Sequence, residues 1–212
     1  MKTPVIITSG TTIEKIDRIH QLSNNSSGAL GAQLADKFAN QGFDVTYISN
    51  AGAIQPTATT NRKLITSAAS LLNALAKEEK SKSVVLHMIS VVDFTISFPD
   101  NKKFSAGAPD EFGAYVKKHI TQSANIVSHL RGMFPDSILM ACKSGVNIKT
   151  LRYDGQKLLE NNCLDIVFVN DYARSEDKGA HFGGIIMNDW EENLYGKDNI
   201  VERIFSNVDR LS

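Results

Sequence analysis

A buried strand, two loops of small polar residues and an amphipathic helix constrain the fold of this chain more than any other feature. Residues 5–7 (Val-Ile-Ile) have the length and β-branching of a buried strand, which hydroxyl residues and Gly10 bring to an end. Downstream of a second polar loop, Leu30, Leu34 and Phe38 recur every four residues. This spacing predicts a helix over about 29–41 that Gly42 ends.

The second loop, residues 22–31, predicts an anion-binding site. A helix that begins behind Ser26-Ser27-Gly28 directs its free backbone N–H groups and the positive end of its dipole into the loop. Phosphate is the commonest occupant of such a place. The alternative is an ordinary serine N-cap followed by glycines, and the sequence leaves both interpretations open.

Strand and helix signals alternate along the rest of the chain. Strands are predicted at 44–49, 64–66, 84–89, 137–142, 165–169 and 182–187, and helices at 67–80, 110–132, 148–161 and 198–209. Periodicity disappears over 94–109, which predicts a mobile loop with a function. The alternation indicates one α/β domain over 1–212, with a Rossmann-like, mainly parallel sheet and helices on both faces. Ligands should then bind at the carboxyl ends of the strands.

Charge and cysteine content narrow the function classes. Lysines and arginines total 23, as do aspartates and glutamates, so no net field recruits nucleic acid or a membrane. Without a basic-plus-apolar leader or an apolar stretch of about 20 residues, we expect a cytoplasmic protein. Cys142 and Cys163 lack ligand spacing and are predicted to be reduced interior thiols. His87, inside an apolar strand, is predicted to be a core histidine.

Common catalytic motifs are missing from the chain. It has no GxGxxG between the first strand and helix, no Walker GxxxxGK[ST], no HExxH and no GxSxG. This argues against a P-loop nucleotidase and weakens a nicotinamide interpretation. Polar and glycine residues nevertheless occur in four loops: at Gly10 after the first strand, at 24–31 in the loop that follows it, at Ser90 and Asp93 after the strand 84–89, and at 170–171 after the strand 165–169. These loops should meet at one edge of the sheet.

This ordered set of residues resembles the phosphopantothenate-cysteine ligase family. The resemblance covers most of the chain, and its most specific element is the run SNxSSGxxG at 23–31. Supporting elements are Thr-Ser-Gly-Thr-Thr at 8–12 with Ile16-Asp17, Val-Asp-Phe at 92–94, and the run at 165–171. With no flavin-binding half ahead of it, the chain would be a free-standing ligase that needs no flavin.

The resemblance implies a two-step acyl transfer. The carboxylate of 4'-phosphopantothenate attacks the α-phosphate of CTP or ATP with Mg²⁺ assisting, and the amine of cysteine then displaces the nucleotide. Such chemistry needs positioning and charge neutralisation more than a covalent nucleophile. By position, the nucleotide-binding residues would be Gly10, Ser26, Gly28, Gly31 and Asn170. Asn24 would hold the substrate carboxylate and acyl intermediate, and Ile89, Ser90 and Asp93 would line the phosphopantothenate site.

The resemblance also implies a lid and a homodimer. The loop after Asp93 matches a lid that supplies a lysine to the phosphates, with Lys103 first and Lys102 second by position. His20 stands where the family usually has an arginine that reaches the substrate phosphate from the neighbouring subunit, and a histidine lacks the bidentate fork of arginine. The family usually has alanines where this chain has Ile89 and Ser90, and a phenylalanine where it has Cys142.

These departures leave open a divergent relative that binds a nucleotide with little or no ligation. A third and more distant alternative is an NAD(P)-dependent reductase. The sequence does not choose between CTP and ATP.

Overall fold

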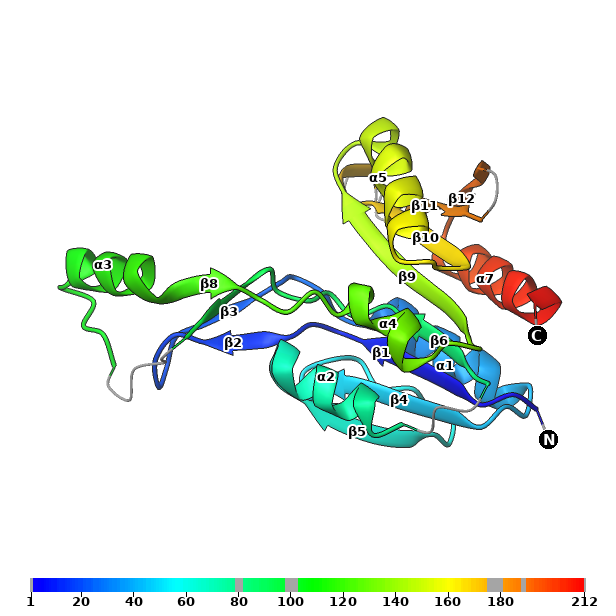
Figure 1. The fold of residues 1–212 in the computed structure, drawn as a ribbon, viewed down its shortest axis with the longest axis horizontal. Coiled ribbons are helices and arrows are strands. Elements are labelled where there is room, and N and C mark those ends of the chain that lie inside the picture. The colour runs from blue at the N-terminus through cyan, green and yellow to red at the C-terminus, as the bar shows by residue number, and fades with distance from the viewer. Residues whose placement is uncertain (1, 79–81, 98–102, 175–180, 188–189, 212) are drawn as a thin grey trace.

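In the computed structural model, which describes residues 2–78, 82–97, 103–174, 181–187 and 190–211, one large sheet forms the body of the molecule (Figure 1). Within those residues eight strands pair in the order β12-β11-β10-β9-β6-β1-β4-β5. They are β1 Val5–Ser9, β4 Val45–Asn50, β5 Asn61–Ile65, β6 Val84–His87, β9 Ile138–Gly145, β10 Ile166–Asp171, β11 Phe182–Ile186 and β12 Trp190–Tyr195. The six strands from β5 to β10 pair in parallel, whereas β11 and β12 pair antiparallel. The predicted fold class, a Rossmann-like and mainly parallel α/β sheet, is confirmed.

Helices cover both faces of the sheet, and each face has its own apolar core. The helices of the body are α1 Ala29–Asn40, α2 Ala68–Ala76, α4 Val127–Met133, α5 Ile148–Asn161 and α7 Lys197–Leu211. Leu34 and Phe38 of α1 pack with Ile204 of α7 on one face. Leu71 of α2, Leu130 of α4 and Leu151 of α5 pack on the other. Because both faces are covered, the central strands begin as continuous apolar runs, as parallel strands usually do, and they become polar only near their carboxyl ends.

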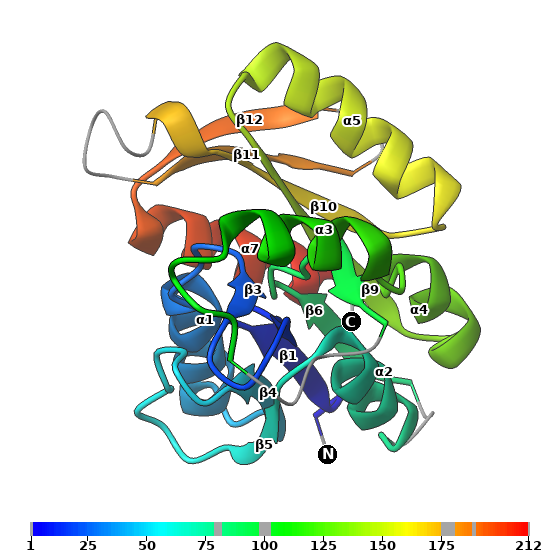
Figure 2. The ribbon, with the colours of Figure 1, turned by 90° about the vertical axis from the view of Figure 1, so that its left-hand side faces the viewer.

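A second region, which we call the arm, projects away from the body (Figures 1 and 2). It consists of two two-stranded sheets and a helix: β2 Ile13–Lys15 with β3 Gln21–Ser23, β7 Phe94–Ile96 with β8 Ile120–Gln122, and α3 Pro109–His119, which lies between β7 and β8 in the chain. Helix α3 has no buried residue, and all three residues of β8 are exposed. The arm therefore has little apolar core of its own.

The arm is also where the sequence-based prediction of secondary structure was wrong. The predicted helix 110–132 is interrupted, because Ile120–Gln122 is extended and pairs with Phe94–Ile96. Residues 94–96 of the predicted mobile loop are therefore a strand, and residues 98–102 lie outside the described part of the chain. The β2–β3 hairpin was not predicted, and neither was the edge strand β12 of the body. Each strand of the arm has only three residues, and its partner decides its conformation.

Candidate functional site

A cavity of about 700 Å³ opens at the carboxyl ends of the central strands, where such sheets bind ligands. It lies within the size range of small-molecule sites. Eight of the predicted site residues line it, which brings together segments far apart in the sequence. They are Asn24, Ser26, Gly28, Gly31, Ile89, Ser90, Asp93 and Asn170.

Glycines allow helix α1 to approach the end of β1 closely. A Cβ atom on Gly31 would lie 2.3 Å from Ser9 Oγ, so any side chain there would displace the helix. Gly28 is the N-cap of α1, with a left-handed φ of 74° that L side chains rarely adopt. Ser9 Oγ then donates to the carbonyl oxygen of Gly28 at 3.0 Å. The first turn of α1 is thereby fixed at the edge of the cavity.

The N-terminus of α1 leaves backbone donors available there. The N-cap residue is Gly28 and not a serine, so the alternative of a serine N-cap is wrong, although Ser27 Oγ accepts from the N–H of Ala29 at 3.4 Å. Among the described residues, no acceptor bonds to the N–H groups of Leu30 and Gly31, and both residues line the cavity. A helix N-terminus with unpaired N–H groups favours an anionic ligand, as the sequence predicted for this loop.

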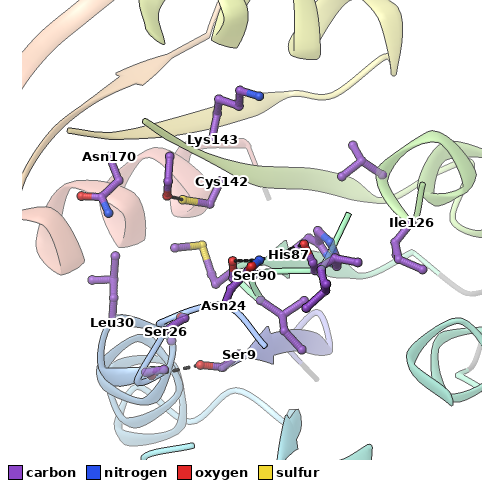
Figure 3. Close-up of a pocket in the computed structure, with 18 of the residues that line it drawn as sticks. Ser9, Asn24, Ser26, Leu30, His87, Ser90, Ile126, Cys142, Lys143 and Asn170 are labelled. Atoms are coloured by element: carbon purple, nitrogen blue, oxygen red, sulfur yellow. Dashed lines mark hydrogen bonds between the residues drawn. The ribbon is translucent and has the colours of Figure 1, made fainter. Parts of the chain in front are cut away.

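Asn24 is held against the loop that follows β6 (Figure 3). Its Nδ2 donates to Ser90 Oγ at 2.9 Å and to the carbonyl oxygen of Val91 at 3.1 Å. Both amide hydrogens are thus used, and Asn24 can donate to a carboxylate only by releasing one of these partners. Because Ser90 Oγ accepts from Asn24, its own hydroxyl hydrogen is free to donate to a ligand. Asn24 and Ser90 therefore form a coupled donor pair.

Two residues that line the cavity, one in β10 and one just before β11, each carry a buried polar atom without a partner. Asn170 Oδ1 and His181 Nδ1 find no hydrogen bond among the described residues. Burial, with the nearby Lys197 charge, lowers the pKa of His181, so its ring is neutral at physiological pH. Buried polar atoms are nearly always bonded in folded proteins, so these two atoms are exceptions among the residues of the lining.

Three predicted residues lie away from the lining. Gly10 is just behind it, where its carbonyl oxygen accepts from Ser90 N–H at 2.9 Å. His20 and Lys103 belong to the arm segments, and both are exposed. Lys102, the second choice for the lid lysine, lies outside the described residues. The predicted roles of all these residues, those in the lining included, stay predictions.

In the arm, a buried carboxylate ties two segments together. Asp17 accepts from the backbone N–H groups of Ile19, His20 and Phe104 at 2.6–3.0 Å and lies 2.7 Å from His20 Nδ1. Burial alone would raise the pKa of Asp17, but the hydrogen bonds from His20, Phe104 and Ile19 outweigh it and lower the pKa well below its usual range. The His20 ring also packs on Phe112 of α3, with ring centroids 5.6 Å apart. Asp17 therefore orients His20 and links it to the chain that leads into α3.

The cysteines contribute little reactive chemistry. Burial raises the pKa of Cys142, which lines the cavity, to about 11, although a contact with Ser144 opposes the shift. The thiol is therefore protonated at physiological pH and a poor nucleophile. Cys163 is exposed, so the prediction of two interior thiols was wrong for it.

Magnesium has one protein carboxylate available in the cavity. Asp93 is the only aspartate or glutamate that lines it in the described part of the chain, and no cluster of three His, Cys, Asp or Glu residues occurs there. Mg²⁺ commonly takes one or two carboxylates together with substrate phosphates. Asp93 fits that mode of binding.

Several lining residues were not predicted from the sequence. They include Ser9, Lys143, Tyr172, His181 and the segment 122–127. Lys143 is the only lysine or arginine in the lining among the described residues, and Figure 3 shows it on the opposite side of β9 from Cys142. Position directly after a strand could have indicated Tyr172, but the segment 122–127 was hidden inside a helix prediction.

No helix in the described residues combines the length and the apolar character needed to cross a bilayer.

Comparisons with known proteins agree with this geometry. The model of the DNA/pantothenate metabolism flavoprotein C-terminal domain matches residues 1–209. A coenzyme A biosynthesis bifunctional protein CoaBC from Methanocaldococcus jannaschii is 27% identical over 98% of this chain and 50% of its own length. The chain spans about half the length of the curated relatives it matches.

Solved structures show the same fold. The DNA/pantothenate metabolism flavoprotein from Streptococcus pneumoniae superposes with a TM-score of 0.84 at 19% identity, over all of both chains. A histidine mutant of Cab2 in complex with phosphopantothenate-cysteine superposes with a TM-score of 0.78 at 14% identity, over 98% of this chain and 87% of that one.

Proposed function

Because the chain belongs to the DNA/pantothenate metabolism flavoprotein C-terminal domain family, we propose that it ligates 4'-phosphopantothenate to cysteine in coenzyme A biosynthesis, consuming CTP or ATP. The observation that carries the proposal is the cavity, in which unpaired N–H groups of α1 face amide and hydroxyl groups from β6 and β10. Several relatives that are similar to this chain are CoaBC proteins. One similar structure is a complex with phosphopantothenate-cysteine, the product of this reaction.

The residues of the cavity suit acyl-nucleotide formation. In the first step, a carboxylate oxygen of 4'-phosphopantothenate bonds to the α-phosphorus as the bond to pyrophosphate breaks. In the second, the cysteine nitrogen bonds to the acyl carbon, loses a proton, and releases the nucleotide. Both steps need oriented donors rather than a protein nucleophile.

We assign these donors to the two sides of the cavity. The N–H groups of Leu30 and Gly31 would hold phosphate oxygens, and the Asn24–Ser90 pair would orient the acyl group. Mg²⁺ bound to Asp93 and the phosphates would supply charge neutralisation. Asn170 would contact the nucleotide.

A pyrophosphate-release assay tests the proposal. With Mg²⁺, pyrophosphate should appear only when 4'-phosphopantothenate and a triphosphate are both present, and the amide product only when cysteine is added. Running CTP and ATP in parallel identifies the nucleotide. Release without the acid, or no triphosphate binding at millimolar concentration, would contradict the proposal.

We further propose that the active species is a homodimer formed through the arm. Ile19, Phe94 and Ile120 are exposed there, and α3 lacks a buried residue. Exposed apolar side chains on an element without its own core indicate a protein partner. In such a dimer His20, oriented by Asp17, would reach the substrate phosphate of the other subunit. Sedimentation and dilution assays test this assembly, because a fully active monomer is incompatible with it.

The alternative function is a relative that binds the nucleotide without ligation. It is favoured by one observation, that Lys143 is the only lysine or arginine in the described lining. Triphosphate binding with no pyrophosphate release under any substrate combination would establish it.

A further inference from the structure

His87 was predicted to be a core histidine, and the structure shows that it is both buried and part of the cavity. Its side chain is 3% exposed, at the end of β6. Successive side chains of a strand point to opposite faces of the sheet, so His87 lies on the same face as Val85 and opposite to Leu86. Ile126 and Ala141 are also buried on that face. The ring nevertheless lines the cavity (Figure 3). A polar group at the boundary between an apolar face and a cavity suggests a ligand contact.

The hydrogen bonds around Thr8 assign the tautomer of His87. Thr8 Oγ1 lies 3.0 Å from His87 Nδ1 and accepts, at 3.5 Å, from the backbone N–H of Ile89. Thr8 is fully buried, and among the described residues its hydroxyl hydrogen has no other acceptor than His87 Nδ1. Leaving that hydrogen unpaired would cost about 1–3 kcal/mol. Thr8 therefore donates to Nδ1, and the ring hydrogen resides on Nε2.

The Nε2–H group is free to contact a ligand. No hydrogen bond within the described residues reaches it, and it does not belong to the buried polar atoms that lack a partner. It therefore faces the cavity rather than the packed interior. Burial lowers the pKa of His87 to about 4, so the ring is neutral at physiological pH. His87 thus presents a fixed, uncharged donor.

The surroundings select the kind of acceptor. Ile126 and Ala141 are buried around this part of the sheet, and placing a polyphosphate against them would carry a large desolvation penalty. The phosphates have a better site at the N-terminus of α1. A planar, uncharged ring with a carbonyl oxygen or ring nitrogen suits a neutral donor among apolar side chains.

We propose that His87 Nε2–H donates a hydrogen bond to an acceptor atom of the nucleobase and so contributes to nucleotide selection. The assignment rests on the proposed function only in taking the ligand to be a nucleoside triphosphate. Thr8 acts through His87, as a positioning residue that fixes the tautomer.

Binding measurements on the full chain separate the base from the phosphates. We would titrate CTP, ATP, the two nucleosides and inorganic pyrophosphate by calorimetry into the wild type, His87→Phe and His87→Gln. Loss of one buried hydrogen bond should weaken triphosphate and nucleoside about tenfold in His87→Phe, with pyrophosphate unchanged. Gln keeps an N–H near Nε2, so His87→Gln should recover part of the loss. His129→Phe, on the exposed surface of α4, is the matched control.

Two results for the variants would overturn the inference: equal weakening of pyrophosphate and nucleoside binding, or unchanged binding of the nucleoside that the wild type prefers. A wild type that binds no triphosphate would also overturn it. Failure of the proposed function gives a different result: the wild type binds the nucleoside, His87→Phe weakens that binding as expected, and no ligated product forms. Unfolding curves show whether each variant is folded.

The tautomer has its own test. The ¹⁵N shifts of labelled histidine should show the Nε2–H form for His87 in the wild type and a mixture in Thr8→Val, which keeps the ring but removes its donor. An Nδ1–H form in the wild type would contradict the assignment, whatever the activity of the protein.

Discussion

The cavity and the arm are built in opposite ways. Around the cavity, donors such as Asn24 and His87 come from packed strands and loops, and their partners lie 66 and 79 residues away in the chain. The arm consists of two two-stranded sheets and a helix with no buried residue, and the buried carboxylate of Asp17 links two of its segments. Groups that must be oriented to within a fraction of an ångström need the rigid body. Groups that act on closure or assembly can belong to the arm.

The largest expected effect is on the cavity side, at Asn24. Asn24→Ala removes the donor to Ser90 and Val91, and product formation should fall about a hundredfold or more, as for other oriented donors. Fold and triphosphate binding should remain. Asn73→Ala, on the exposed side of α2, is the control. Normal turnover by Asn24→Ala would show that the body does not orient the reacting group.

As the pH falls, groups in the body should lower the free energy of unfolding at a higher pH than groups in the arm do. His87 has an ordinary pKa of 6.5 when unfolded and about 4 when folded, so the unfolded state binds more protons between these values. Its contribution to the free energy of unfolding, about 3 kcal/mol, is complete above pH 6.5 and is lost as the pH falls toward 4. His181 acts in the same direction. Urea unfolding between pH 7 and 4.5 should show a smaller loss for His87→Gln than for the wild type.

The arm should respond only at lower pH. The lowered pKa of Asp17 stabilises the fold above its unfolded value of 3.8, and this contribution is lost as the pH falls below that value. Asp17→Asn should therefore change the unfolding profile below pH 4 and leave its slope between pH 7 and 4.5 intact. A changed slope above pH 4.5 would mean that the two regions do not titrate separately.

A pair of glycine substitutions sharpens the comparison. In Gly31→Ala the new Cβ would collide with Ser9, which should cost about 2 kcal/mol by overpacking and weaken triphosphate binding. In Gly113→Ala, within α3, nothing lies within 4 Å of the new Cβ, and the helix should gain up to about 1 kcal/mol. Thermal unfolding and nucleotide titration measure both. Equal destabilisation by the two would contradict a tightly packed body beside a loosely packed arm.

The smallest expected effect is at Lys103. If it neutralises polyphosphate charge from a closing lid, Lys103→Ala should slow pyrophosphate release about tenfold and leave thermal stability nearly unchanged, since the side chain is exposed. Lys118→Ala, also exposed, in α3, is the control. A silent Lys103→Ala would move the lid assignment to Lys102 and leave the prediction for Asn24 intact.

Much of the site was predictable because parallel strands end at a common edge. Residues that directly follow strands, such as Ser90 and Asn170, were placed at the cavity from local patterns alone, and so was the Ser26–Gly31 loop. Lys143 follows the predicted strand 137–142 and could have been placed in the same way, but it was overlooked. His181 was missed because it precedes β11, an antiparallel strand that begins, rather than ends, at this edge of the sheet. The segment 122–127 was missed because its helix-like pattern runs across a strand, and only pairing with β7 interrupts it.

The sequence by itself determined the elements whose periodicity is local. The apolar runs specify the central strands β1, β6 and β10, and the four-residue spacing specifies α1, because burial on a sheet or helix face repeats at a fixed interval along the chain. The tertiary structure alone decided which polar atoms are available to a ligand. The tautomer of His87 depends on Thr8, the amide of Asn24 on Ser90, and the carboxylate of Asp17 on Phe104. Each of these is a hydrogen bond between segments that only the folded chain brings within 3.0 Å.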